Sequence, residues 1–179
     1  MNDSVWIGST ELSGAKAYNL YFKQKLNQVG RFEFYAVKNA LSTAERALLV
    51  PGAIVRISVA GTIRFEGYIS IITEDKSRKI YEIEGYSLAG ILNTRTTRTP
   101  VALRGGVDGD LITGKQIVQQ AVFRFGGFAT TGNTGWSITG GDGVDTYFYK
   151  FESKSILDHV VGAAKSSGYD WRVYIDEGA

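Results

Sequence analysis

Three runs of alternating apolar residues lie between Pro51 and Pro100, and they constrain the fold more than any other part of the sequence. A spacing of two is typical of strands that bury one face. Short turns separate the runs, and one turn, residues 74–79, is almost entirely charged. The pattern therefore predicts long antiparallel strands in a small closed or nearly closed barrel. The residues expected to face its core are Val55, Ile57, Val59, Ile63, Phe65, Gly67, Ile69 and Ile71.

One glycine interrupts the second run. Gly67 stands inside a strand pattern, where a bulge or bend is the usual reason for glycine. The third run, residues 80–85, returns towards a short segment with Leu88, Ile91 and Leu92 on one side. We interpret this segment as a helical turn that plugs or closes the barrel.

The residues before Pro51 add a hairpin and one helical turn. Residues 16–37 contain two alternating runs around a turn at residues 27–30, with Tyr18, Leu20 and Phe22 expected to be buried on the first strand and Phe32, Phe34 and Ala36 on the second. Residues 1–15 suit a short strand or an arm. Ser42 or Thr43 can cap a helical turn that ends before Pro51 and Gly52.

A Gly/Asp-rich stretch at residues 105–110 marks a predicted boundary between a barrel, residues 1–104, and a second part, residues 105–179. Thr113 and Gln116 form a capping-box pattern for a helix that ends near Gly126. A strand is expected at residues 147–151, followed by a helix that Ser153 caps. Its apolar stripe comprises Ile156, Leu157, Val160, Val161 and Ala164. Trp171, Val173 and Ile175 alternate as a last strand. The fold class is therefore mainly β with two helices (α+β).

Composition excludes several classes of protein. Apolar residues make up 44% of the 179 residues, which suits a packed soluble core. No apolar run approaches the roughly 18 residues of a membrane span. The net charge of +2 does not favour nucleic acid or an acidic surface as a partner. The absence of cysteine removes disulfides and thiolate metal sites.

This order of segments resembles the hub proteins of phage tails and phage-like baseplates. In that family a strand of the type G-x-x-V-x-I, here Gly52, Val55 and Ile57, leads to F-x-G-x-I, here Phe65, Gly67 and Ile69. A returning strand then ends in a Leu-rich segment, here residues 86–92, and two helices follow. The resemblance covers residues 18–173. It implies a tail-tube-type barrel, a second related barrel, and three copies in a ring.

The resemblance implies a function without chemistry. It predicts a non-enzymatic structural protein of a baseplate hub, without a cofactor, that pairs its strand edges with other copies in a trimer or ring. Other expected partners are tube, spike and tape-measure proteins. The expected location is a virion tail, or a prophage product made in a bacterial or archaeal cytoplasm. Because the chain stops where strands of the second barrel should continue, we expect an incomplete second domain.

Two motifs point to ligands and have simpler explanations. Residues 109–116 nearly match the phosphate-binding pattern G-x-x-x-x-G-K-[ST], but Gln116 takes the place of the hydroxyl that binds Mg²⁺. A capped helix after a glycine turn explains the same residues, including Lys115. Loop carboxylates can gather Ca²⁺, but we favour the interpretation that these are solvated turn residues. These carboxylates are Asp108, Asp110, Asp142 and Asp145.

The remaining candidates are one histidine and three arginines. His159 is the only histidine, so a typical zinc site or catalytic triad has too few parts, and we expect it on the flank of a helix. Arg95, Arg98 and Arg104 offer an alternative function: a small barrel that binds single-stranded nucleic acid or glycan. No catalytic, cofactor-binding or metal-binding residue is predicted.

Overall fold

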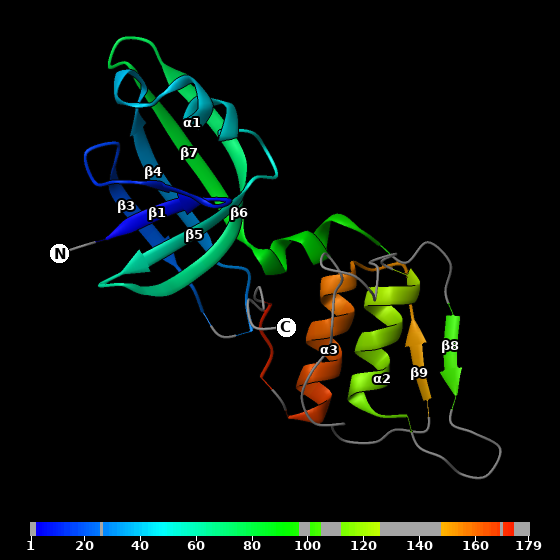
Figure 1. Cartoon of the computed structure of the whole chain (residues 1–179). Helices are drawn as coiled ribbons and strands as arrows, with labels where there is room; N and C mark the ends of the chain where they lie inside the picture. The colour runs from blue at the N-terminus through cyan, green and yellow to red at the C-terminus, as the bar shows by residue number, and fades with distance from the viewer. Residues whose placement is uncertain are drawn as a thin grey trace. The chain divides into compact units, whose positions relative to one another are not determined.

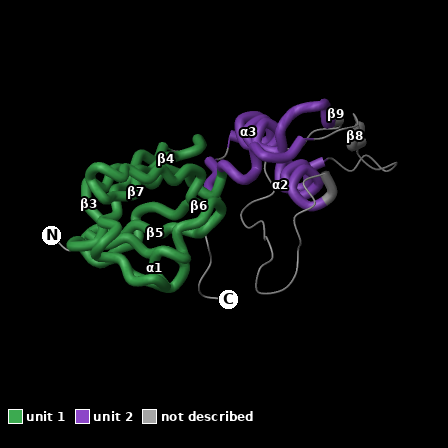
Figure 2. The backbone as a smooth tube through the Cα atoms, turned by 90° about the horizontal axis from the view of Figure 1, so that it is seen from above, with its two compact units in different colours: residues 1–89, 173–179 green, residues 90–172 purple. Residues whose placement is uncertain are grey.

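The computed structural model describes residues 3–25, 27–96, 101–104, 112–125, 148–168 and 170–173. The chain forms two compact units, residues 1–89 with 173–179, and residues 90–172 (Figure 2). The predicted division at residues 104 and 105 differs from this one. Strand β8 (Val101–Arg104) pairs with β9 (Phe148–Phe151), so it belongs with the second unit.

The first unit is a single antiparallel sheet of seven strands (Figure 1). The strand order is β2-β1-β5-β6-β7-β4-β3, which leaves β2 and β3 at the edges. The prediction of a mainly β, α+β fold is confirmed, and so is the hairpin over residues 16–37. The strands are β1 (Ser4–Ile7), β2 (Thr10–Leu12), β3 (Ala17–Lys23), β4 (Arg31–Val37), β5 (Ile54–Val59), β6 (Thr62–Asp75) and β7 (Ile80–Ser87).

One apolar cluster forms the core on the buried face of this sheet, and all seven strands contribute residues to it. A flat sheet keeps its edge strands far apart, so a shared cluster requires a sheet that curls around its own buried face. Three phenylalanines form the aromatic centre: the Phe32 ring lies 5.6 Å from Phe65 and 6.1 Å from Phe34. All three are at most 2% exposed, and each contributes about 1.5–3 kcal/mol by leaving water.

Two glycines allow the paired central strands β6 and β7 to approach closely. A Cβ on Gly67 would lie 2.2 Å from the Tyr86 carbonyl oxygen, and one on Gly85 would lie 2.0 Å from the Tyr68 carbonyl oxygen. No side chain fits at such distances. Gly67 is thus explained by close approach, while the bulge of β6 lies further along, where the pairing with β7 shifts between Ile69 and Ile71.

Bulges also correct the predicted inward faces. A bulge adds one residue and exchanges the two faces of a strand beyond it. Tyr18, Ile63 and Ile71, all expected inside, are 42%, 45% and 49% exposed. Where the pairing of β5 with β6 shifts between Ile57 and Ser58, the extra residue is Arg64 of β6, which turns Ile63 outward. Ser58 lies opposite Ser4 on the outward side of β5 and is nevertheless buried, while Val59, expected inside, is half-buried.

The helical turn before Pro51 is α1 (Thr43–Leu48), which follows a short 3-10 helix, η1 (Lys38–Ala40). Ser42 caps α1, with its Oγ accepting from the Glu45 backbone N–H at 3.2 Å. The Glu45 carboxylate accepts from the Ser42 backbone N–H at 2.7 Å and from Lys16 Nζ at 2.6 Å. Lys16 thereby ties the helix to the β3 end of the sheet, and its hydrogen bond holds the pKa of Glu45 down at about 2.

The predicted plug is a 3-10 helix, η2 (Leu88–Thr94), that begins where the first unit ends. Its residues Leu88, Ala89 and Leu92 are at most 5% exposed. None of them belongs to the apolar cluster inside the sheet, so the segment does not plug that core.

The second unit pairs β8 with β9 and packs α2 (Gly114–Gln119) against α3 (Ile156–Ser167). A π-helical segment, η3 (Gln120–Phe125), extends α2. Thr113 and Gln116 form the predicted capping box. The cap of α3 is Ser155, and not Ser153. Residues 171–173 form no strand, and the remainder of the predicted last strand lies outside the described residues.

Candidate interaction surface

In the phosphate-loop candidate, two backbone N–H groups at the start of α2 are already used by the capping box of that helix. Thr113 Oγ1 accepts the Gln116 backbone N–H at 3.1 Å, and Gln116 Oε1 accepts the Thr113 backbone N–H at 2.9 Å. A phosphate at a helix start accepts from free backbone N–H groups, and these two are not free. Residues 109–111 lie outside the described residues, so the structure places only Lys115 and this cap.

The other loop candidates are placed only in part. Asp108, Asp110, Asp142, Asp145 and Arg98 lie outside the described residues, and for Arg104 only the backbone is described. Arg95 is exposed, and its carbonyl accepts the Ile156 backbone N–H at 2.9 Å. Within the described ranges, no group of three or more acidic or histidine side chains is arranged to hold a metal ion. Nor does any helix among them have the length and apolar character to cross a membrane.

His159 is buried, and the prediction of a helix-flank position is wrong. The side chain is 2% exposed, and its ring centroid lies 5.0 Å from that of Phe151. Its Nε2 lies 3.1 Å from the Glu152 carbonyl oxygen, which can only accept, so Nε2 carries the proton. The Tyr149 hydroxyl, 3.2 Å from Nδ1, then donates to it. Burial lowers the pKa of His159, and the residue joins α3 to β9 as a neutral packing group.

The most distinctive surface of the first unit is the outward side of β3, β4 and β7. Strand register sets three rows across it, Tyr18–Tyr35–Glu82, Tyr21–Glu33–Glu84 and Lys23–Arg31–Tyr86. Tyr18, Tyr21 and Tyr86 are more than 40% exposed. We call this surface the tyrosine–glutamate face, and it consists of Tyr18, Tyr21, Glu33, Tyr35, Glu82, Glu84 and Tyr86.

Like charges meet on this face. Glu33 and Glu84 lie directly opposite each other on paired strands, an arrangement that destabilises a sheet. Burial, together with Glu33 and Glu82, raises the pKa of Tyr35. Among the residues whose side chains are described, none forms an ion pair with Glu33, Glu82 or Glu84. Exposed tyrosines are enriched at protein interfaces. The carboxylates and the neighbouring Lys23 and Arg31 give this surface a defined charge pattern that a partner would have to complement.

The two edges of the sheet offer little regular backbone for pairing. β2 has three residues, and β3 is interrupted between Tyr18 and Tyr21, where Asn19 takes a φ of +53°. Bulges and short strands are the usual protection of a sheet edge against uncontrolled pairing. On either side of this interruption β3 keeps a regular register with β4, over Ala17 and Tyr18 and, at its longer regular end, over residues 21–23.

Comparison with known proteins finds similarity in structure alone. No protein-family model matches the chain, and no curated protein matches its sequence. Among solved structures, the 43 kDa tail protein of prophage MuSo2 from Shewanella oneidensis matches 93% of this chain with a TM-score of 0.61 and 12% identity. The tail protein from Neisseria meningitidis MC58 also matches 93% of this chain, with a TM-score of 0.55 and 16% identity. The chain has the fold of phage tail proteins.

A protein of a bacterial secretion system has a similar fold. A component of the type VI secretion system of E. coli, described as structurally similar to T4 tail proteins, matches 89% of this chain with a TM-score of 0.52 and 12% identity. The resemblance inferred from the Gly52 and Phe65 motifs is thus confirmed at the level of fold. The chain spans 49%, 45% and 42% of the lengths of the three structures.

Sequence reasoning missed the tyrosine–glutamate face. Its members alternate with buried residues on three strands, so each strand alone reads as an ordinary half-buried strand. The like-charge pair becomes visible only when the register between β4 and β7 is known.

Proposed function

We propose that this chain is a structural protein of a phage tail or phage-like tail, and that it belongs to the baseplate hub. The observation that carries the proposal is the match of about nine-tenths of the chain, across both units, to tail proteins from different bacteria. Agreement over both units is more specific than a match to one small β-sheet, which many unrelated proteins share.

The proposed mechanism is surface complementarity between proteins, without catalysis. The tyrosine–glutamate face supplies large, rigid side chains for contact and carboxylates that select a positively charged neighbour. We further propose that copies of the chain assemble into a trimer or ring, with the regular end of β3 as the pairing edge. The other proposed partners are the tube, spike and tape-measure proteins of the same particle.

Immunogold electron microscopy tests the location. An epitope inserted in the β6–β7 turn, at Ser77, leaves the strand pairing intact because that turn is exposed. Particles produced by a strain that encodes the chain should then carry label at one end of the tail. An untagged strain is the control. Label on the capsid, or purified particles that contain none of the chain, would contradict the proposal.

Native mass spectrometry tests the assembly. The protein that contains this chain should give a trimer or a larger ring, and a strict monomer at micromolar concentration would remove the ring from the proposal. Glu33→Gln with Glu84→Gln should weaken capture of tail partners. Glu11→Gln, on a different part of the same sheet, should not.

A further inference from the structure

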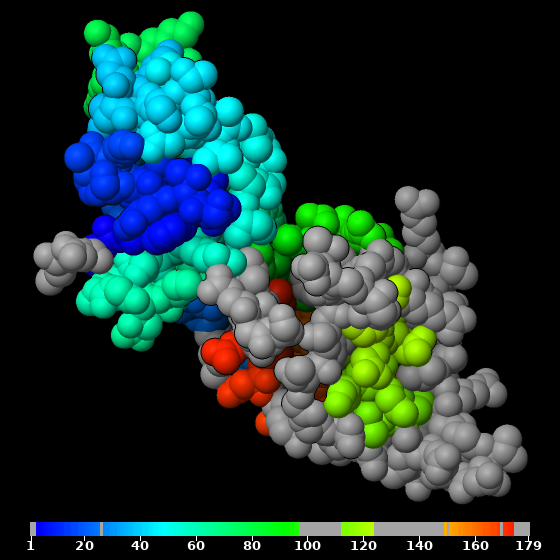
Figure 3. Space-filling model, viewed as in Figure 1, coloured from blue at the N-terminus to red at the C-terminus, as the bar shows by residue number. Residues whose placement is uncertain are grey.

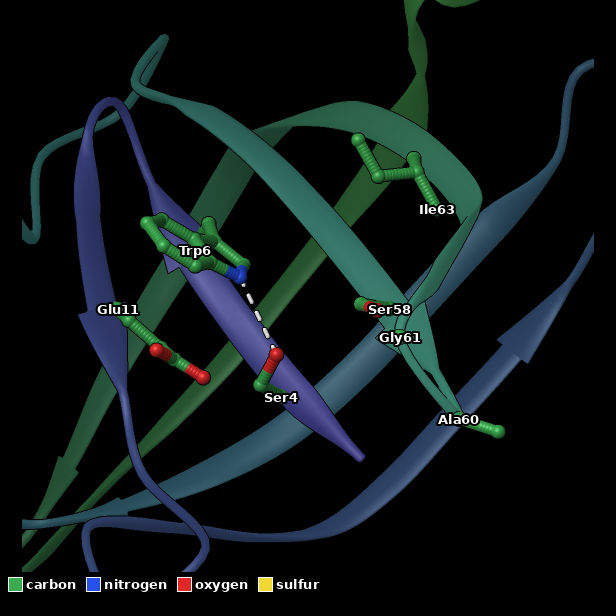
Figure 4. Close-up of a pocket in the computed structure, with 7 residues that line it drawn as sticks. All are labelled: Ser4, Trp6, Glu11, Ser58, Ala60, Gly61 and Ile63. Atoms are coloured by element: carbon green, nitrogen blue, oxygen red, sulfur yellow. Dashed lines mark hydrogen bonds between the residues drawn. The ribbon is translucent and has the colours of Figure 1, made fainter. Parts of the chain in front are cut away.

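A depression lies on the outward side of β1, β2 and β5, away from the tyrosine–glutamate face (Figure 4). It has a volume of about 720 Å³ and is open to solvent. Trp6 and Ser4 come from β1, Glu11 from β2 and Ser58 from β5, and the turn at Ala60 and Gly61 forms a rim with Ile63. Figure 3 shows the atoms of β1, in dark blue, at the molecular surface beside the green-cyan β5–β6 turn.

Ser58 offers a hydroxyl group to the depression. The residue is 6% exposed and lines the depression, and within the described part of the chain its hydroxyl makes no hydrogen bond. Its oxygen is not one of the described buried atoms that lack a partner, so it is open to the depression. The regular pairing of β1 with β5 places Ser58 opposite Ser4, on the outward side of the sheet. A ligand in the depression can therefore hydrogen-bond to it.

The groups around Ser58 define the chemistry of that ligand. Trp6 Nε1 donates to Ser4 Oγ at 3.1 Å, so the Ser4 hydroxyl proton remains available for donation. The indole presents an apolar ring, and Ile63, 45% exposed, adds an apolar wall. Glu11 is the one ionised side chain of the lining, and it makes no ion pair with any described residue. Its charge disfavours phosphates and other anions.

We propose that this depression binds a neutral saccharide unit. The C–H face of a sugar packs on an aromatic ring, while its hydroxyl groups both donate and accept hydrogen bonds. Glu11 only accepts, Ser4 has a proton left to donate, and Ser58 can do either. A lysine or arginine side chain of a protein fits less well, because it offers no acceptor to the Ser4 hydroxyl. The proposal does not depend on the assignment to a phage tail.

Nitrogen-15 NMR of the whole chain tests the proposal with two probes, triacetylchitotriose and maltotriose. Trp6→Phe identifies the indole N–H signal of Trp6 among the three tryptophans. This signal should shift in a saturable manner with at least one sugar, while the signals of Trp136 and Trp171 stay in place. If neither sugar shifts the Trp6 signal, the proposal is wrong.

Single substitutions locate the site. Ser58→Ala removes one hydroxyl, and loss of one hydrogen bond should weaken binding about three- to tenfold. Its melting temperature should stay the same or rise, because no protein partner is lost. Ser77→Ala, in the exposed β6–β7 turn outside the depression, is the matched control and should bind normally. Equal affinity of Ser58→Ala and the native chain would overturn the proposal. A second result would also overturn it: an oligolysine peptide shifts the Trp6 signal while the sugars do not, and the peptide loses this effect in the Glu11→Gln variant.

Discussion

Replacing Gly85 by alanine tests the close approach of the paired strands β6 and β7. The new Cβ would lie 2.0 Å from the Tyr68 carbonyl oxygen, and ordinary contact begins at 3.4 Å. One strand must therefore move by about 1.4 Å. The Phe32 ring, 2.5 Å from the same position and 2% exposed, blocks movement to the other side.

Overpacking of this kind costs about 3 kcal/mol, at the upper end of the usual range, because neither neighbour can yield. For a unit of fewer than 100 residues this lowers the melting temperature by roughly 12–24 °C. Differential scanning calorimetry of the whole chain measures the shift in the transition of the first unit. Gly14→Ala is the control, since its Cβ would meet nothing within 4 Å. A Gly85→Ala chain that melts within about 2 °C of the native chain would refute the reasoning.

Three further predictions concern stability. Ser155→Ala should destabilise the second unit by about 1 kcal/mol by removing the α3 cap, while Ser153→Ala should have no effect, as urea unfolding can show. Burial lowers the pKa of His159 below its ordinary 6.5, so below that pH the unfolded chain binds more protons than the folded chain. The stability of the second unit should therefore fall as the pH drops below 6.5. Thermal melts at a series of pH values should show this dependence, and His159→Phe should remove it. Glu45 has a pKa of about 2 against an ordinary 4.5, so its contribution is present above pH 4.5 and is lost as the pH falls towards 2. Acid unfolding followed by circular dichroism should show a smaller loss in Lys16→Met.

Most strands named from the sequence are present in the structure, and so is the one capping box named from it. The period-two runs predicted β4, β5, β6 and β7, because burial of one strand face is a local pattern that the order of residues records directly. The Thr113–Gln116 box is local in the same sense, since both partners lie within one turn. The cap of α3 was misplaced by two residues. Ser155 forms a capping box with Asp158, three residues on, whereas the residue three after Ser153 is Ile156, which cannot complete a box.

Residue contacts across strands could not be predicted. The burial of His159 depends on Tyr149 and Phe151 from β9, and its partner Glu152 lies just beyond that strand. The opposition of Glu33 and Glu84 depends on the register between β4 and β7. The depression at Trp6 depends on β1, β2 and β5 lying side by side.

The sequence by itself determined the strand-rich class, the Gly52 and Phe65 motifs that predicted the tail-protein fold, and the absence of cysteine chemistry. These follow from local periodicity and composition. Only the tertiary structure decided which side of each strand faces water, because one bulge exchanges the two faces of everything beyond it. For that reason Ile63 and Ile71 lie outside, and the two surfaces proposed for binding appear only once the sheet is formed.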